Sequence, residues 1–317
     1  MKIVIPGGTG QVGTILARAF HDEGHETIVL SRSASEKSDW RVVKWDAETI
    51  SDWASEFEGA DVVINLVGRS VNCRYTPENR REIIQSRVKS TKVVGEAIAK
   101  ASNPPRVWLQ ASTATIYAHR FDAPNDELTG IIGGSEADAP DTWNFSIDVA
   151  KAWEKAANEV NTPRTRKVLL RSAMTMSPDK GGIFDVMVGL VRKGLGGTSG
   201  DGRQYLSWIH DADFIRSIQW FIEHEEMSGA VNLAAPNPLP NKEFMKILRE
   251  AWGISFGLPA NKLMLEIGAI FMRTETELVL KSRRVVPTRL LESGFEFEFP
   301  TWAEAARDLC RRWREEN

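Results

Sequence analysis

Cysteine is scarce in this 317-residue chain, and no long apolar run is present. The two cysteines, Cys73 and Cys310, lie far apart and form neither a metal-binding spacing nor a disulfide framework, so we expect no metal and a reducing, cytoplasmic location. No apolar stretch approaches the roughly 20 residues that span a bilayer, and the chain runs straight into its first predicted strand, so no signal peptide is expected. The net charge of -3 gives no electrostatic case for nucleic acid or an anionic membrane as a partner.

The most informative stretch that is present runs from Lys2 to Gly13. Four residues read as a buried strand, a glycine turn follows, and then the apolar periodicity of a helix begins. Glycine at positions 7, 10 and 13 permits a sharp turn and lets a pyrophosphate approach the backbone, where the helix N-terminus attracts its charge. This context predicts a dinucleotide site. The alternative is a tight strand-to-helix turn without a ligand.

The end of the second predicted strand indicates which dinucleotide is preferred. Sites for NAD usually carry Asp or Glu there to bind the ribose 2′-hydroxyl, whereas this chain has Ser31 followed by Arg32. The guanidinium of Arg32 can bind a 2′-phosphate, so we predict NADP(H) as the cofactor. The alternative is a solvated arginine at a strand end.

Strand and helix patterns alternate over residues 1–172 and predict an α/β fold, a Rossmann-type doubly wound parallel sheet. Segments from about 205–235 are expected to complete the sheet, and 173–317 to form a smaller C-terminal α+β substrate region. Residues 120–145 read as a loop or lid. Phenylalanines alternate with glutamates over 295–299, which predicts a half-buried strand. Thr301 and Glu304 form a capping box for a final helix.

Several stretches resemble a known family. The turn from Gly7 to Gly13 is similar to the GGTGFIG start of extended short-chain dehydrogenases/reductases. The blocks RREIIQSRVKST at 80–91, GDGRQYLSWIHDADF at 200–214 and VPTRLLESGFEFEFP at 286–300 resemble an atypical branch, the epimerase family proteins. The resemblance implies a Rossmann fold, NADP(H) binding, a small C-terminal substrate domain and a poorly defined small-molecule substrate.

The resemblance also implies cofactor contacts at matching positions. The pyrophosphate would lie against Gly7, Thr9, Gly10, Gln11 and Val12, and the 2′-phosphate against Ser31 and Arg32. Trp45 and Asp46 would lie near the adenine, and Leu66, Val67 and Gly68 under its ribose. The further positions implied are Glu82, Arg87 and Ser112, with Met174 and Thr175 at the nicotinamide end.

One expected motif is missing. Short-chain dehydrogenases use Tyr-x-x-x-Lys on a helix, in which the lysine lowers the pKa of the tyrosine. The residues four places after the three tyrosines (75, 117 and 205) are Asn79, Phe121 and Ile209. The corresponding helical slots fall near Ser146 and Ala150, and Lys151 is rotated by about 100° from the second slot. Ordinary dehydrogenase or epimerase chemistry therefore needs a substitute group.

Five residues are candidates for that chemistry. Thr113 can hydrogen-bond a substrate oxygen and Tyr117 can donate a proton, although a turn hydroxyl and a buried tyrosine are the plain alternatives. Arg203, Gln204 and His210 are candidates for substrate binding, although solvated loop residues and a structural histidine are equally ordinary.

Two hypotheses follow. The first is an NADP-dependent oxidoreductase or epimerase-like enzyme that acts on a small carbonyl or nucleotide-sugar-like substrate, as a monomer or homodimer. The second is a regulatory or sensor protein that binds NADPH with little or no catalysis. The missing Tyr-x-x-x-Lys pair favours the second hypothesis, and the full-length C-terminal region favours the first.

Overall fold

A seven-stranded parallel sheet organises the first part of the chain. The computed structural model describes residues 1–33, 38–136, 139–271 and 273–316. The strands lie in the order β10-β6-β5-β4-β1-β2-β3. Their bounds are β1 Lys2–Pro6, β2 Glu26–Ser31, β3 Arg41–Lys44, β4 Val62–Asn65, β5 Val107–Thr113, β6 Arg166–Ser172 and β10 Gly229–Leu233. This order confirms the predicted doubly wound α/β fold.

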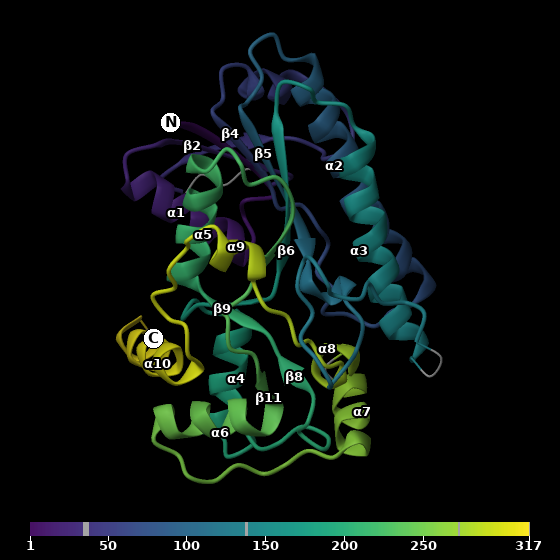
Figure 1. The fold of residues 1–317 in the computed structure, drawn as a ribbon, viewed down its shortest axis with the longest axis vertical. Helices are drawn as coiled ribbons and strands as arrows, with labels where there is room; N and C mark the ends of the chain where they lie inside the picture. The colour runs from purple at the N-terminus through teal and green to yellow at the C-terminus, as the bar shows by residue number, and fades with distance from the viewer. Residues whose placement is uncertain (34–37, 137–138, 272, 317) are drawn as a thin grey trace.

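Helices cover both faces of the sheet because its strands are apolar on both sides (Figure 1). In β1, Ile3 and Ile5 pack into one core cluster, whereas Val4 packs into the cluster on the opposite face. One face is covered by α1 Gln11–Asp22, α5 Asp211–Glu223 and α9 Thr288–Glu292, and the other by α2 Pro77–Lys100 and α3 Asp141–Glu159. A short 3-10 segment, Asp52–Phe57, connects β3 and β4.

The C-terminal region packs below the sheet around its own apolar core (Figure 1). At its centre the rings of Phe244 and Trp302 stack 3.9 Å apart. Its strands are β7 Met174–Met176, β8 Tyr205–Leu206, β9 Trp208–His210 and β11 Leu239–Pro240, and its helices α4 Ile183–Arg192, α6 Asn241–Trp252, α7 Lys262–Phe271, α8 Glu277–Leu280 and α10 Trp302–Glu316. The predicted capping box starts α10, where the Glu304 N–H donates to the Thr301 hydroxyl oxygen at 3.5 Å and the Thr301 hydroxyl donates to the Glu304 carboxylate at 2.6 Å.

Two expectations about local structure were wrong. Residues 295–299 do not form a strand, because the backbone N–H groups of Glu298 and Phe299 donate to the buried Asp213 carboxylate at 2.8 and 2.9 Å. The predicted loop at 120–145 ends earlier than expected, since α3 begins at Asp141; residues 137–138 of that loop lie outside the described residues.

The division of the chain into 1–172 and 173–317 stays a prediction, although β10 joins the sheet from the second part. Within the described residues, no helix has the length and apolar character needed to cross a membrane.

Candidate functional site

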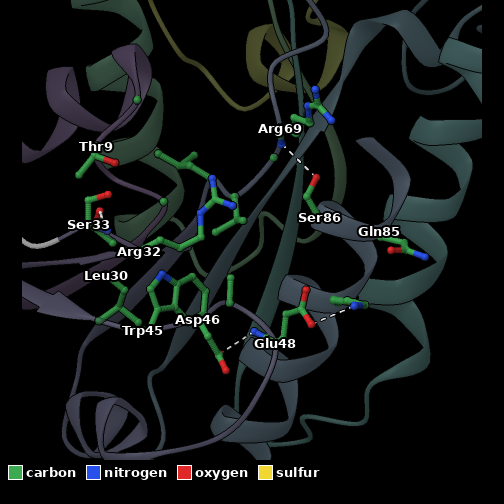
Figure 2. A pocket seen from close by; sticks show the side chains of 18 of the residues that line it. Thr9, Leu30, Arg32, Ser33, Trp45, Asp46, Glu48, Arg69, Gln85 and Ser86 are labelled. Carbon is green, nitrogen blue, oxygen red and sulfur yellow. Dashed lines mark hydrogen bonds and ion pairs between the residues drawn. The ribbon is translucent and has the colours of Figure 1, made fainter. Parts of the chain in front are cut away.

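A cavity of about 940 Å³ lies at the carboxyl ends of the strands. It sits where the strand order reverses, between β1 and β4, the usual ligand position in such sheets. Its walls come from the turns after β1, β2, β3 and β4 and from one face of α2 (Figure 2). The lining residues are Gly7, Thr9, Gly10, Leu30, Ser31, Arg32, Ser33, Trp45, Asp46, Ala47, Glu48, Leu66, Val67, Gly68, Arg69, Glu82, Gln85, Ser86 and Lys89.

The three motif glycines have different physical reasons to be glycine. Gly7 has a φ of +78°, and a Cβ there would lie 2.9 Å from the backbone nitrogen of Val67. A Cβ on Gly13 would lie 2.4 Å from the Cα of Gly8, so close packing of helix on turn requires glycine. Among the described residues, a Cβ on Gly10 would meet only the carbonyl oxygen of Gly7, at 3.9 Å. Packing inside the protein therefore does not require glycine at position 10, whereas the approach of a ligand would.

The N-terminus of α1 directly follows this turn. Its N-cap, Gly10, has no side chain to bond the first-turn N–H groups, and the first turn carries no acidic residue. These N–H groups and the positive end of the helix dipole form an anion-binding element.

Most charges that line the cavity are already paired. Arg69 forms an ion pair with Glu82, and Lys89 forms one with Glu48 at 2.9 Å. Arg32, in contrast, has no carboxylate partner within the described residues, and its side chain extends to the middle of the cavity (Figure 2). Ser33 adds a hydroxyl beside it, and the Ser33 N–H donates to Ser31 Oγ at 3.2 Å, which shapes the turn.

The turn after β3 is held by Asp46. Its carboxylate accepts from the N–H groups of Glu48 and Thr49, at 2.9 Å each, and from the Thr49 hydroxyl. These bonds, that of the Thr49 hydroxyl first, lower the pKa of Asp46 to about 2. Beneath the turn, the ring of Trp45 packs edge-on against Trp53 with centroids 5.1 Å apart. Asp46 therefore stays charged and keeps the following residues in place.

Arg87 supports the cavity from below without lining it. Its buried guanidinium donates to the carbonyls of Arg69 and Ile83, at 3.0 Å each, and lies 4.8 Å from the ring of Trp153. A Cβ on Gly68 would lie 2.9 Å from this guanidinium. The backbone of Gly68, which lines the cavity, therefore packs directly against Arg87. Burial lowers the pKa of Arg87 to about 10.

The structure brings eleven of the predicted cofactor residues to the cavity: Gly7, Thr9, Gly10, Ser31, Arg32, Trp45, Asp46, Leu66, Val67, Gly68 and Glu82. Other predicted residues lie elsewhere. The Gln11 amide donates to Ser177 Oγ at 2.9 Å, and Val12 packs against the core. Ser112 donates to the Glu154 carboxylate at 2.6 Å, and Met174 and Thr175 lie on β7.

Sequence reasoning identified only Glu82 on the cavity wall that α2 forms, and it missed Gln85, Ser86 and Lys89. Glu82, Gln85, Ser86 and Lys89 follow at helical spacing and share one face of α2. That spacing was a usable signal, because a polar helix face next to a predicted dinucleotide turn can line the site.

Thr113 and Tyr117 differ in how their hydroxyls are bound. Tyr117 is 2% exposed, donates to Asn232 Oδ1 and accepts from Arg171, both at 2.9 Å. Burial raises the pKa of Tyr117. Thr113 accepts from the N–H of Thr115 at 3.2 Å, and its hydroxyl hydrogen has no acceptor within the described residues. Thr113 therefore has a free donor at the end of β5, whereas the Tyr117 hydroxyl is engaged as donor and acceptor.

The three predicted substrate residues lie outside the main cavity. Arg203 lines a separate hollow of about 630 Å³, and its guanidinium lies 5.5 Å from the ring of Phe121. The buried Gln204 amide donates to the carbonyls of Ser199 and Val279 at 2.9 and 3.2 Å.

His210 is fully buried at the N-terminus of α5. One ring nitrogen accepts from the Ala212 N–H at 3.1 Å, and the other lies 3.2 Å from the Asp308 carboxylate. Its ring stacks on Phe299 at 3.8 Å, and burial lowers the pKa of His210. Both nitrogens therefore have structural partners.

The parallel sheet, the glycine turn and the cavity at the strand-order reversal define a dinucleotide-binding protein of the Rossmann type. Residues 3–137 match the model of the NAD dependent epimerase/dehydratase family, and residues 262–309 match a domain of unknown function, DUF1731. Over 303 residues the chain is 30% identical to epimerase family protein YfhF of Bacillus subtilis, covering 94% of both chains. It is 28% identical over 312 residues to human epimerase family protein SDR39U1, covering 98% of this chain and 99% of the human one.

The chain is also similar in structure to a solved epimerase family protein. The crystal structure of human epimerase family protein SDR39U1 (isoform 2) with NADPH has a TM-score of 0.85 and 27% identity, covering 98% of this chain and 99% of that one. The chain therefore belongs to the epimerase family proteins, a branch of the short-chain dehydrogenases/reductases.

Proposed function

We propose that the cavity binds NADP(H), with the pyrophosphate at the N-terminus of α1 and the adenosine 2′-phosphate at Arg32. The observation that carries this proposal is the lone charge of Arg32. The lining holds three cationic and three acidic side chains, yet only Arg32 among the cations lacks a carboxylate partner within the described residues. The human relative solved with NADPH supports the same cofactor.

A bond from Arg32 to the 2′-phosphate would favour NADP(H) over NAD(H). A charge-assisted hydrogen bond contributes roughly 1.5–3 kcal/mol, which corresponds to a preference of about 10- to 100-fold for the phosphorylated cofactor. No acidic residue at the end of β2 opposes the phosphate, because Ser31 stands there and its hydroxyl accepts a bond from the N–H of Ser33. Ser33 supplies a second hydroxyl beside Arg32.

For the reaction, we propose reduction or epimerisation of a small carbonyl or nucleotide-sugar-like substrate. The bound cofactor supplies or accepts a hydride. Thr113 is the better placed of the two predicted hydroxyls, because its hydrogen has no acceptor within the described residues and can orient a substrate oxygen. The engaged hydroxyl of Tyr117 argues for a structural role, so we assign the proton to an ordered water rather than to this tyrosine.

The second candidate is an NADPH-binding regulatory protein without turnover. It is favoured by the missing Tyr-x-x-x-Lys pair and by the structural bonds of Tyr117. The two readings share the cofactor and differ only in whether chemistry follows binding.

One experiment separates the two readings. The protein is titrated with NADPH, NADP and NADH, and the nicotinamide absorbance is then followed against a panel of carbonyl and nucleotide-sugar compounds. Turnover that falls at least about 10-fold in Thr113→Val and is retained in Thr113→Ser supports the enzyme, because a lost hydrogen bond to a charged oxygen costs roughly 1.5 kcal/mol or more. Tight NADPH binding with no turnover across the panel supports the regulatory protein.

A further inference from the structure

Helix α7 lies at the outer edge of the C-terminal region and presents apolar side chains to solvent (Figure 1). Lys262 and Glu266 are the only polar residues among its ten. Within 262–270, however, Ala269 alone is buried. A helix that is apolar on nearly all sides is normally covered by other protein or by lipid. We therefore expect the exposed side of α7 to have a partner.

The exposed side of α7 carries a continuous apolar stripe. Leu263, Ile267 and Ile270 follow one another at the spacing of one helix face, and Met264 lies beside them. These four side chains are 48–65% exposed. Scattered apolar residues on a surface need no explanation, whereas four on one side of a short helix form a patch that does.

The stripe continues onto the loops before the first residue of α7. The N–H of Leu258 donates to the Gly194 carbonyl at 2.7 Å, which places Leu258 next to Leu195, and both leucines are about half exposed. These two leucines and the four residues of the stripe are called the α7 patch. Six side chains of this size supply a large part of the roughly 800 Å² that each partner contributes to a standard protein interface.

Two charges along one edge of the stripe indicate the kind of partner. Lys262 and Glu266 lie one turn apart, and neither side chain forms an ion pair or a hydrogen bond within the described residues. Because these charges are opposite, α7 has no net charge and lacks the basic face that attracts a helix to an anionic membrane. A protein surface with the same two charges in reverse order would pair with both, and a second copy of α7 running the other way has that order.

We propose that the α7 patch is the interface of a symmetric homodimer, in which two copies of α7 pack antiparallel about a twofold axis near Met264. Residues at equal distances before and after the axis then face each other, so Lys262 of each copy lies opposite Glu266 of the other. Leu263 and Ile267 of the two copies pack together between these charges. Since α7 begins the matched domain of unknown function, residues 262–309, self-association becomes a role of that domain in this chain.

Sedimentation velocity of the intact protein, from about 1 to 100 µM, tests the dimer. We expect a species of twice the 35.4 kDa mass of the chain. In Ile267→Glu the dissociation constant of the dimer should rise at least about 100-fold, because the interface would bury two unpaired carboxylates. The variant should keep the wild-type circular dichroism spectrum, because the side chain of Ile267 is half exposed within one chain.

Exchanging the two charges tests the antiparallel packing. Lys262→Glu and Glu266→Lys should each weaken the dimer about 10-fold, because like charges then face each other across the axis. The double variant should return to within about 3-fold of the wild type, since opposite charges face each other again. Leu291→Glu is the matched control and should leave the dimer intact, because Leu291 is an equally exposed apolar residue on α9, away from α7 (Figure 1).

A wild type that stays monomeric at about 100 µM overturns the inference, as does a dimer that Ile267→Glu leaves intact. A double variant as weak as the single variants refutes the antiparallel packing. Binding of the wild type, but not of Ile267→Glu, to vesicles of phosphatidylcholine and phosphatidylserine would assign the patch to a membrane and overturn the dimer. NADPH affinity should be unchanged in all these variants, because α7 does not line the cofactor cavity, so each outcome is separate from the proposed function.

Discussion

Replacing Gly10 by alanine separates ligand binding from folding at the glycine turn. Gly10 is the N-cap of α1 with a φ of -78°, which alanine adopts without strain. Outside its chain neighbours, the new Cβ would have the Gly7 carbonyl oxygen, 3.9 Å away, as its nearest neighbour among the described residues. Because alanine is a somewhat poorer N-cap than glycine, the free energy of unfolding should fall by no more than about 1 kcal/mol.

The effect on cofactor binding should be much larger. In the proposed complex, the added methyl group occupies the space through which the pyrophosphate reaches the first-turn N–H groups of α1. Weakening one charge-assisted hydrogen bond costs roughly 1.5–3 kcal/mol, so the dissociation constant for NADPH should rise about 10- to 100-fold. Fluorescence titration measures the affinity, and urea denaturation of the same variant measures the stability.

Gly13→Ala is the contrasting variant. Its Cβ would lie 2.4 Å from the Cα of Gly8, so the helix must shift, and overpacking of this kind costs about 1–3 kcal/mol. We expect Gly13→Ala to lose stability and Gly10→Ala to lose affinity. Unchanged NADPH affinity in Gly10→Ala, or a loss of stability as large as that of Gly13→Ala, would refute the pyrophosphate assignment.

Three further predictions concern buried polar groups. Asp213→Asn should lower the free energy of unfolding, measured by urea denaturation, by about 3 kcal/mol. The carboxylate accepts the N–H groups of Glu298 and Phe299 and pairs with Arg216, and an amide cannot make all three contacts. A loss of stability below about 1 kcal/mol would contradict this. Burial lowers the pKa of Lys281 to about 8, so the folded protein binds fewer protons than the unfolded chain between that value and the ordinary 10.5. From about pH 7 to pH 9.5, the free energy of unfolding should therefore rise by about 2 kcal/mol more in the wild type than in Lys281→Met. If the free energies of unfolding of the two proteins change in parallel with pH, the lowered pKa of Lys281 is wrong. Tyr117→Phe should lower stability by about 1–3 kcal/mol without changing NADPH affinity; if it keeps wild-type stability and abolishes turnover, the tyrosine is catalytic after all.

The first half of the fold could be predicted because its signals are local. The glycine turn after Pro6, the apolar strands and the helix ends each depend on a few neighbouring residues, and the structure confirms the alternation that they indicate. Ser31 ends β2 and Arg32 follows it directly, so their position at the end of this strand was enough to predict that they line the cavity.

The missed features depend on contacts between distant residues. The alternating pattern at 295–299 suits a strand, yet Asp213, about 85 residues earlier, takes the N–H groups that a neighbouring strand would need. Tyr117 has the position of a proton donor, but its partners Arg171 and Asn232 come from β6 and β10. The spacing of Glu82, Gln85, Ser86 and Lys89 indicates a polar face of α2, but its place in the cavity wall depends on tertiary contacts such as the bond from the Arg69 N–H to the Ser86 hydroxyl.

The preference for NADPH over NADH, measured in the wild type and in Arg32→Ala, tests the central claim most directly. Arg41→Ala is the control, because Arg41 pairs with Glu56 and does not line the cavity. We predict that the wild type and Arg41→Ala bind NADPH at least about 10-fold more tightly than NADH, and that Arg32→Ala loses this preference with little change for NADH. A wild type that prefers NADH, or an Arg32→Ala variant that keeps the full preference for NADPH, would contradict the account.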